Sequence, residues 1–246
     1  MKLSGIGKMY GTRMILRNIS LHTHPGELSF LVGANGAGKT TLLRIMAGLA
    51  KPTAGSLDPE YEAGELAYLG HRPFLYSGMT ALENLAFWNK LQGHPETSLL
   101  TFLQRVELDR FAHERAGSFS RGMVQRLNLA RVLLQAPRVL LLDEPETGLD
   151  KRSLALLRRE MRSARDNGAT IVWITHDLQS NAELADRVLT IAGKTLAYDG
   201  SVSEWPGLEA LEEKIKNSRT EKSGGLRHRT TTGTAKINKN AGEATC

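Results

Sequence analysis

Three features that many proteins carry are missing from this chain of 246 residues. No uninterrupted apolar run reaches the length of about 18 residues that a membrane-spanning helix needs. Residues 1–5 lack the apolar stretch with which a secretion signal begins. The only cysteine is Cys246, so no disulfide can form within the chain. These absences predict a cytoplasmic protein that has no spanning segment of its own.

The net charge of +6 is concentrated in one segment of the chain. Residues 218–246 contain six basic and two acidic side chains, which leaves a net charge of +2 for residues 1–217. A nearly neutral folded part does not indicate a nucleic-acid partner. Leu226 and Ile237 are the only large apolar residues of the segment, too few to offset the entropy of ordering it. We therefore predict one domain over residues 1–217 and a disordered basic tail over 218–246.

Short apolar runs alternate with helical patterns through most of this domain. The runs expected to form strands are Leu28–Val32, 139–142, Thr170–Ile174 and 187–191. The segments expected to form helices are 40–49, 80–91, where Thr80 and Glu83 make a capping box, and 150–166. Alternating strands and helices are typical of a mostly parallel sheet that is covered on both faces. Residues from about 75 to 135 contain no convincing strand and indicate a helical insertion.

A glycine-rich segment lies between the first expected strand and the first expected helix. It consists of Gly33, Ala34, Asn35, Gly36, Ala37, Gly38, Lys39 and Thr40, which fit the pattern G-x-x-x-x-G-K-[ST]. Such glycines let backbone N–H groups point at phosphate oxygens, and the helix N-terminus favours the same anion. We expect Lys39 to bind the β- and γ-phosphates, Thr40 to bind Mg²⁺, and Thr41 to lie beside the nucleotide. The alternative, a chance glycine-rich turn, is disfavoured by the flanking strand and helix.

Two acidic residues follow the apolar run 139–142. Asp143 and Glu144 come at the carboxyl end of a buried parallel strand, where α/β sheets bind their ligands. We expect Asp143 to hold Mg²⁺, directly or through water, and Glu144 to act as the base toward the attacking water. The alternative is that both acids only cap the following turn. His176 follows the strand Thr170–Ile174 and is expected to orient the water, although a lone histidine is more often a structural or surface residue.

A further motif lies at residues 119–126, shortly before the strand that leads to Asp143. Ser120 and Gly122 match the signature Leu-Ser-Gly-Gly-Gln. The residues that depart from its commonest form are Phe119, Arg121 and Met123. With these motifs in this order, residues 1–217 resemble the nucleotide-binding domain of ABC transporters. Ser120 would cap a helix whose N-terminus faces an anion, and without the other motifs it would indicate only an ordinary capped helix.

This resemblance implies a P-loop NTPase fold with a mostly parallel core sheet, an N-terminal antiparallel β part and a helical subdomain. It implies an ATP hydrolase coupled to transport, with ATP and Mg²⁺ as cofactors. Two subunits would sandwich two ATP molecules, each between one glycine-rich loop and the opposite Ser120 helix. Tyr10, before the expected strand 18–22, matches the aromatic residue that stacks on adenine, although alone it would indicate ordinary packing. Asp150 ends the segment 147–150, which matches the loop that crosses the dimer interface.

His71 aligns with a glutamine of the family that senses Mg²⁺ and contacts the membrane partner. A neutral imidazole can make one hydrogen bond there, and its charge would depend on pH. Residues 70–73, followed by 80–85, look like the ATP-binding subunit of the heme exporter of cytochrome c maturation. Another ABC exporter remains an alternative, and a soluble ABC protein that acts on ribosomes or DNA is less favoured. A P-loop kinase would leave Ser120 and His176 unexplained.

The partners that the resemblance implies are an integral-membrane permease and a second ATP-binding subunit, which makes a homodimer. Such a subunit lies peripherally at the cytoplasmic face of the inner (plasma) membrane. The permease would dock in a groove beside the His71 loop. The groove would be lined by His71, Pro73, Phe74, Leu75 and Tyr76. The alternative is that Phe74 and Leu75 anchor the helical insertion to the core.

Overall fold

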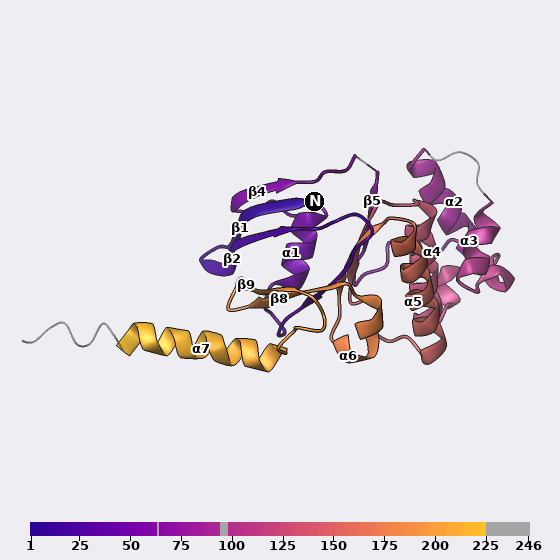
Figure 1. Cartoon of the computed structure of the whole chain (residues 1–246). Helices are drawn as coiled ribbons and strands as arrows, with labels where there is room; N and C mark the ends of the chain where they lie inside the picture. Colours follow the sequence, from indigo (N-terminus) through magenta and orange to yellow (C-terminus); the bar gives the residue numbers. More distant parts are fainter. Residues whose placement is uncertain (63, 94–97, 225–246) are drawn as a thin grey trace, which may run out of the picture.

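The computed structural model describes residues 1–62, 64–93 and 98–224, which form two sheets flanked by helices (Figure 1). The strands are β1 (Lys2–Tyr10), β2 (Arg13–His22), β3 (Leu28–Val32), β4 (Ala54–Asp58), β5 (Leu66–Leu69), β6 (Val139–Asp143), β7 (Thr170–Ile174), β8 (Arg187–Ala192) and β9 (Thr195–Gly200). The smaller sheet is antiparallel, in the order β2-β1-β4. The larger sheet has the order β5-β6-β7-β3-β8-β9.

The larger sheet is parallel from β5 to β8, and only β9 runs antiparallel to its neighbour. Every residue of β3, β6 and β7 is buried, as expected for parallel strands covered on both faces. The predicted bounds of β3 and β7 are confirmed, and β6 and β8 each extend one residue beyond the predicted run. The predicted fold class is therefore confirmed, including the antiparallel N-terminal part.

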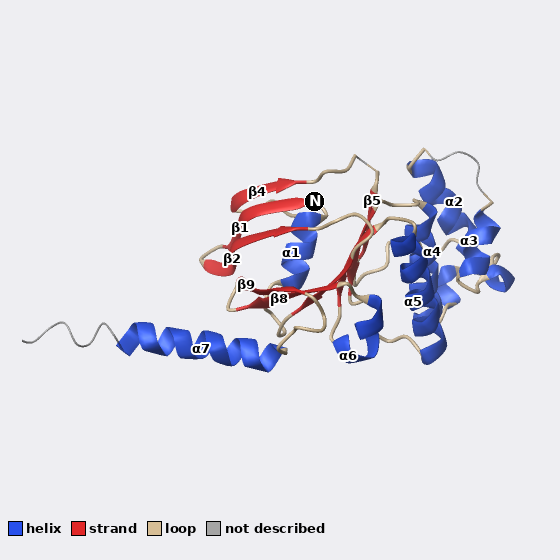
Figure 2. Ribbon diagram, viewed as in Figure 1, coloured by secondary structure: helices blue, strands red, loops and turns tan. Residues whose placement is uncertain are grey.

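Helices cover both faces of this sheet (Figure 2). They are α1 (Lys39–Met46), α2 (Ala81–Leu91), α3 (Leu99–Arg105), α4 (Arg121–Leu134), α5 (Lys151–Asp166), α6 (Leu178–Asn181) and α7 (Leu208–Gly224), with 3-10 turns at Asp109–Phe111, Ala116–Ser118 and Ala182–Leu184. α1 lies between the two sheets, where Leu42 and Leu43 join one core with Leu141. α4 and α5 cover the other face, where Leu127 and Leu156 share a second core with Trp173. No described helix has both the length and the hydropathy required to cross a bilayer.

A helical region lies between β5 and β6 in the chain and beside the edge strand β5 in space (Figure 1). It contains α2, α3 and α4, and no strand is found among the described residues of 75–135. The predicted capping box starts α2: the Thr80 hydroxyl accepts from the Glu83 amide at 3.1 Å, and the Glu83 carboxylate accepts from the Thr80 amide at 2.7 Å. The helix therefore begins where its sequence predicts.

The C-terminal boundary differs from the prediction. The helix α7 continues to Gly224, so residues 218–224 are helical. The sequence pattern instead predicts a disordered tail that begins at residue 218. Leu211 of this helix is buried, and its Glu, Lys and Ala residues favour helix formation. Once such a helix is anchored, adding further residues costs little, because propagation is easier than nucleation. The rest of the predicted tail, residues 225–246, lies outside the described residues.

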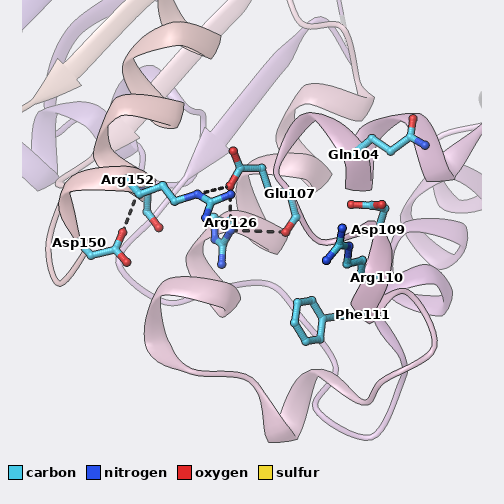
Figure 3. A pocket seen from close by; sticks show the side chains of 9 residues that line it. Gln104, Glu107, Asp109, Arg110, Phe111, Arg126, Asp150 and Arg152 are labelled. Atoms are coloured by element: carbon cyan, nitrogen blue, oxygen red, sulfur yellow. Dashed lines mark hydrogen bonds and ion pairs between the residues drawn. The ribbon is translucent and has the colours of Figure 1, made fainter.

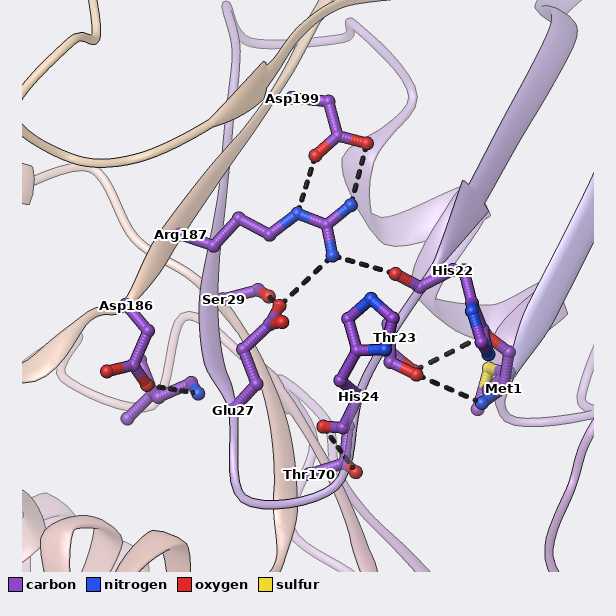
Figure 4. A network of polar contacts seen from close by, with 11 residues as sticks. Met1, His22, Thr23, His24, Glu27, Ser29, Thr170, Asp186, Arg187 and Asp199 are labelled. Atoms are coloured by element: carbon purple, nitrogen blue, oxygen red, sulfur yellow. Dashed lines mark hydrogen bonds and ion pairs between the residues drawn. The ribbon is translucent and has the colours of Figure 1, made fainter.

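Arg187, at the start of β8, ties the small sheet to the large one (Figure 4). Its guanidinium donates to both carboxylate oxygens of Asp199 and to Glu27 at 3.2 Å. It also donates to the backbone carbonyl of His22, the last residue of β2, at 2.7 Å. Bidentate arginine–carboxylate contacts fix geometry well. This network holds the end of β2 against the start of β3, whose far end carries the glycine-rich loop.

Candidate active site

Three chain segments meet because of the strand order of the large sheet. β6, β7 and β3 are adjacent and parallel, so the residues that follow them emerge at one edge of the sheet. The glycine-rich loop follows β3, Asp143 and Glu144 lie at the end of β6, and His176 comes shortly after β7. These are the segments that the motifs predicted to work together, although residues 40 and 143 are far apart in the chain.

The glycine-rich loop depends on two of its glycines. Gly38 has a φ of 107° and caps α1, and a Cβ at this position would lie 2.7 Å from the Leu16 side chain. Gly33 approaches β8 closely, since a Cβ there would lie 2.5 Å from the carbonyl oxygen of Ile191. A side chain at either position would force a shift of the loop. The loop can therefore curl tightly between β3 and α1.

Lys39 is almost fully buried at the centre of this loop. Its Nζ donates to the carbonyl oxygen of Gly33 at 2.8 Å and to that of Ala34 at 3.2 Å. Burial lowers the pKa of Lys39, and the charges of Glu144 and Asp143 oppose that shift. The cavity beside it has a volume of about 280 Å³. The residues that line this loop cavity are Arg13, Ile15, Asn35, Gly36, Gly38, Lys39, Thr40, Thr41 and Glu144.

Asp143 is held by two hydroxyl groups from different elements. The Thr40 hydroxyl donates to its Oδ1 at 3.0 Å, and the Tyr68 hydroxyl donates to its Oδ2 at 3.3 Å. Burial raises the pKa of Asp143, and the two hydrogen bonds act in the opposite direction. A carboxylate and a hydroxyl are oxygen donors of the kind that Mg²⁺ binds, usually with only one or two protein carboxylates. The donor set at Thr40 and Asp143 therefore fits this cation.

Glu144 and His176 are in direct contact. The Oε1 atom of Glu144 lies 2.6 Å from Nε2 of His176. Glu144 also has a φ of 52°, an uncommon conformation for a residue with a side chain. Its amide donates to the carbonyl oxygen of Ile174, which fixes the turn after β6 against the end of β7. Strained backbone of this kind often occurs where a side chain must be held at a working position.

The predicted signature, residues 119–126, lies at the start of α4. Glu144 lies between it and the glycine-rich loop, because Glu144 lines a cavity beside each of them. Ser120 caps the helix, and its hydroxyl accepts from the Met123 amide at 3.3 Å. Arg121 lies against Gly148, where a Cβ would be 2.6 Å from the arginine Nε. A second cavity of about 270 Å³ lies here. Its lining residues are His71, Pro73, Phe119, Arg121, Val124, Gln125, Glu144 and Thr147.

Asp150 caps α5 and lines a larger cavity of about 580 Å³ (Figure 3). Its Oδ1 accepts from the Ser153 amide at 2.7 Å, and this hydrogen bond lowers the pKa of Asp150. Elsewhere in the cavity, Glu107 pairs with Arg152 at 2.7 Å and with Arg126 at 3.7 Å. Glu107 thus pairs with two of the arginines that line this cavity. Asp150 does not reach the loop cavity beside Lys39.

The structure separates some of the predicted site residues from the others. Tyr10, Ser120, Gly122 and Asp150 do not line the loop cavity of their own chain. Tyr10 is 51% exposed at the end of β1, and the Nζ of Lys8 lies 4.9 Å from the centre of its ring. His71 lines the second cavity rather than the first.

Sequence reasoning missed Tyr68 and the pair Arg13 and Ile15. Tyr68 comes from β5, a short edge strand that was not predicted, and it contacts Asp143 across 75 positions of the chain. Arg13 and Ile15 belong to β2 and line the loop cavity. Their signal was weak, because an aromatic or aliphatic residue in a strand usually indicates only packing, and an arginine usually indicates only an exposed position. The one sign of its role in the sequence was that Tyr68 lies two residues before Gly70 and three before His71.

Comparison with known proteins gives the same family from sequence and from structure. Residues 16–147 match the family model described as ABC transporter. The lantibiotic transport ATP-binding protein SrtF of Streptococcus pyogenes is 34% identical over 226 residues, which cover 88% of this chain and 96% of SrtF. The cytochrome c biogenesis ATP-binding export protein CcmA of Rhodopseudomonas palustris strain HaA2 is 40% identical over 184 residues, which cover 72% of this chain and 92% of CcmA.

A solved structure extends the similarity to three dimensions. It is a dimeric, post-hydrolysis ATP-binding cassette bound to ADP and Pi. The TM-score is 0.72 at 25% sequence identity, and the match covers 83% of this chain and 99% of the other.

Proposed function

The chain belongs to the ABC transporter family as an ATP-binding subunit, and from this premise we propose which residues hydrolyse ATP and which transporter they serve. The observation that carries the proposal is the meeting of three groups at one edge of the sheet. They are Lys39 in its loop, the pair of Thr40 with Asp143, and the pair of Glu144 with His176. Hydrolysis of ATP coupled to transport is the activity of this family.

Lys39 and the loop amides bind the phosphates. The Nζ of Lys39 contacts two carbonyl oxygens of its own loop, so it lies where the β- and γ-phosphate oxygens approach α1. The N-terminus of α1 adds amide donors and the positive end of its dipole. These groups balance the negative charge that the transferred phosphoryl group carries. Thr41 and Asn35 line the same cavity and complete the contacts.

Glu144 is the base, and His176 positions it. The carboxylate takes a proton from the water that attacks the γ-phosphorus, the bond to the β-phosphate oxygen breaks, and ADP and phosphate result. The contact of 2.6 Å with Nε2 of His176 keeps the carboxylate oriented. When ATP is bound, the Nε2–H group of His176 can donate its hydrogen bond to a γ-phosphate oxygen instead of to the Glu144 carboxylate. His71, which lines the neighbouring cavity, takes the place where a glutamine is usual in the family.

A bound Mg²⁺ would neutralise charge on the β- and γ-phosphates. Thr40 and Asp143 would hold this cation through their oxygen atoms, directly or through water, because small divalent cations keep part of their hydration shell. The existing hydrogen bond between the two residues, at 3.0 Å, keeps both oxygens on one side of the loop.

The active form is a homodimer. Ser120, Gly122 and Asp150 do not line the loop cavity of their own chain, which supports a role across a dimer interface. In this arrangement the Ser120 end of α4 faces the γ-phosphate bound by the partner, and residues 147–150 cross between the subunits. The dimeric ADP-bound relative supports the same assembly. Tyr10, exposed at the end of β1 and paired with Arg13, stacks on adenine. The subunit lies peripherally at the cytoplasmic face of the inner membrane, bound to a permease.

The transporter served is the heme exporter of cytochrome c maturation. The similarity to CcmA and the segment 70–73 support this choice. Another ABC exporter is the second candidate, because SrtF, a lantibiotic transport protein, matches over more of the chain.

Loss of this subunit tests the proposed transporter. We expect cells that lack it to lose covalently bound heme from their c-type cytochromes, measured by heme staining of denaturing gels. The wild-type chain should restore staining, and a Glu144→Gln variant made at the same level should not. Normal staining in cells without the subunit would rule out heme export and favour the other exporters.

The permease docks on an aromatic surface that consists of Phe74, Tyr76, Phe87 and Trp88. Phe74 is 46% exposed and Tyr76 is 48% exposed. Trp88 donates to the carbonyl oxygen of Phe74 at 2.9 Å, and the Tyr76 and Phe87 rings lie 4.8 Å apart. Leu75 is partly buried against the core, so the anchoring alternative applies to this residue and not to its two neighbours. A cluster of aromatic rings with two of them exposed is typical of interfaces.

Phe74→Asp should separate docking from folding. We expect the variant to keep the circular dichroism spectrum of the wild type, because the side chain is half exposed. It should lose co-purification with the membrane subunit, since a charge in the apolar centre of an interface is costly. Leu49→Asp is the matched control, because Leu49 is 52% exposed but follows α1. Equal retention of the membrane subunit by both variants would place the permease elsewhere.

A further inference from the structure

The carboxylate of Asp143 is held at both of its oxygens, and only one of the two holders belongs to the phosphate-binding loop. Thr40 donates to Oδ1, and Tyr68 donates to Oδ2 at 3.3 Å. Each carboxylate oxygen has two lone pairs, so one on each oxygen stays available to a cation or to water. With one donor on each side, the carboxylate group cannot rotate freely. The orientation of Asp143 therefore depends on a residue of the edge strand β5.

The reach of Tyr68 follows from the register of the sheet. β5 and β6 are parallel, with Tyr68 paired to Leu141, two residues before Asp143. Side chains two apart on a strand share a face, so Leu141 and Asp143 lie on the face of the sheet that Tyr68 also faces. The shared face places the Tyr68 hydroxyl 3.3 Å from Oδ2 of Asp143, within reach of a hydrogen bond.

Gly70 makes room for this ring. A Cβ on Gly70 would lie 2.6 Å from Cε1 of Tyr68 and 3.1 Å from Cζ. The tyrosine ring therefore lies against the backbone of Gly70, and any side chain there would push the hydroxyl end of the ring away. This gives a physical reason for a small residue immediately before His71.

The backbone of Tyr68 is anchored from α4. Arg131 is buried, and its Nη2 donates to the carbonyl oxygen of Tyr68 at 3.1 Å. Its Nε donates to the Asn128 side chain at 2.9 Å. The guanidinium lies 5.1 Å from the centre of the Trp88 ring and 5.5 Å from that of Phe74. Cation–π contacts of this kind are strongest for desolvated arginines. Arg131 thus connects β5 to the aromatic surface.

We propose that Tyr68 is a positioning residue for the metal-binding carboxylate of Asp143, seated by Gly70 and anchored through its backbone by Arg131. The inference rests on the proposed role of Asp143 in holding Mg²⁺. Tyr68 does not line the loop cavity. It sets the direction of the carboxylate, as partners of metal ligands commonly do, and loss of such partners typically weakens metal binding by about 10–100-fold.

Tyr68→Phe removes the hydroxyl and keeps the ring. ADP binding has a part that depends on Mg²⁺, and we expect the Mg²⁺ concentration that half-saturates this part to rise about 10-fold in the variant. This is the low end of the effect of losing such a partner, because phosphates and water also hold the ion. Calorimetric titration of ADP into the full chain, over a series of MgCl₂ concentrations, measures it. ADP affinity in EDTA should not change. Tyr61→Phe is the matched control: Tyr61 is a partly buried tyrosine whose hydroxyl donates to the carbonyl oxygen of Met46. It should leave the Mg²⁺ requirement unchanged.

Gly70→Ala tests the same contact without removing the hydroxyl. The added methyl group should displace the Tyr68 ring and raise the Mg²⁺ requirement in the same direction. Asp143→Asn separates this inference from the proposed site. If Asp143→Asn abolishes the Mg²⁺ dependence while Tyr68→Phe equals wild type, the positioning role is wrong and the metal site stands. If Asp143→Asn also leaves the dependence intact, the proposed metal site itself is wrong, and the inference falls with it.

Discussion

Glu144→Gln is expected to lower ATP turnover by about 10²–10⁴-fold, the usual cost of removing a general base. Glutamine keeps the size of the side chain and can still accept a hydrogen bond from His176, which lies 2.6 Å from the carboxylate. It cannot accept the proton of the attacking water. Binding of ATP should therefore persist, and the protein should accumulate as an ATP-bound dimer that size-exclusion chromatography detects. Phosphate release under steady-state conditions measures the turnover.

The control for this variant lies two residues away. Glu146 belongs to the same turn, and its carboxylate accepts from Nε1 of Trp173 at 2.7 Å. Glutamine at position 146 keeps an acceptor oxygen for the indole, so Glu146→Gln should retain turnover near that of the wild type. Turnover by Glu144→Gln within a factor of a few of the wild-type value would show that another group is the base.

Lys39→Ala is expected to weaken binding of ATP by about 2–5 kcal/mol, the usual cost of truncating one partner of a buried charge pair. Each 1.4 kcal/mol corresponds to a tenfold change in the dissociation constant, so the loss is roughly 30-fold or more. The fold should survive, since burial already disfavours the charged lysine, as its lowered pKa indicates. Calorimetric titration of ATP measures the affinity, and thermal unfolding measures the stability.

Lys51→Ala is the matched control for Lys39→Ala. Lys51 is an exposed lysine that follows α1, so its removal should change neither affinity nor unfolding temperature. An unchanged affinity in Lys39→Ala would contradict the proposed phosphate contact. A large drop in its unfolding temperature would instead show that the two carbonyl contacts of Lys39 stabilise the loop.

The parts of the fold that the sequence predicts best are those whose signal is local. β3 and β7 have the predicted bounds because each is a short apolar run between turns, buried on both sides. Thr80 starts α2 because its capping partner is only three residues away. Local patterns of this kind need no knowledge of the tertiary structure.

The edge strands could not be predicted in the same way. β5 is four residues long with two of them only partly buried, and β9 is partly buried almost throughout. Each lies at an edge of the sheet and pairs with one neighbouring strand only, so their sequence patterns are weak. The same holds for α7, where residues 218–224 lack the apolar spacing of a packed helix and yet continue one that Leu211 anchors.

The candidate site divides in the same way, into residues that a local motif predicts and residues that only the tertiary structure reveals. The glycine-rich loop and the acids at the end of β6 are sequence motifs, and the structure brings them to one edge of the sheet. Tyr68 and Arg131 act through contacts between residues far apart in the chain, and no motif records those contacts. Ser120 and Asp150 need a second subunit before their proposed contacts can form, so one chain cannot display them.

The central position of β3 governs when during synthesis the nucleotide site can form. Leu28 pairs with Ile171, and Ser29 pairs with Arg187, so the two neighbours of this strand are made long after it leaves the ribosome. Contacts between such distant parts of a chain close slowly, and unpaired strands are prone to aggregate meanwhile. β3 therefore lacks both of its neighbouring strands until residues as far as Thr190 have been translated. Binding of ATP would then stabilise only those chains in which the sheet has formed, because a ligand stabilises the folded state that binds it.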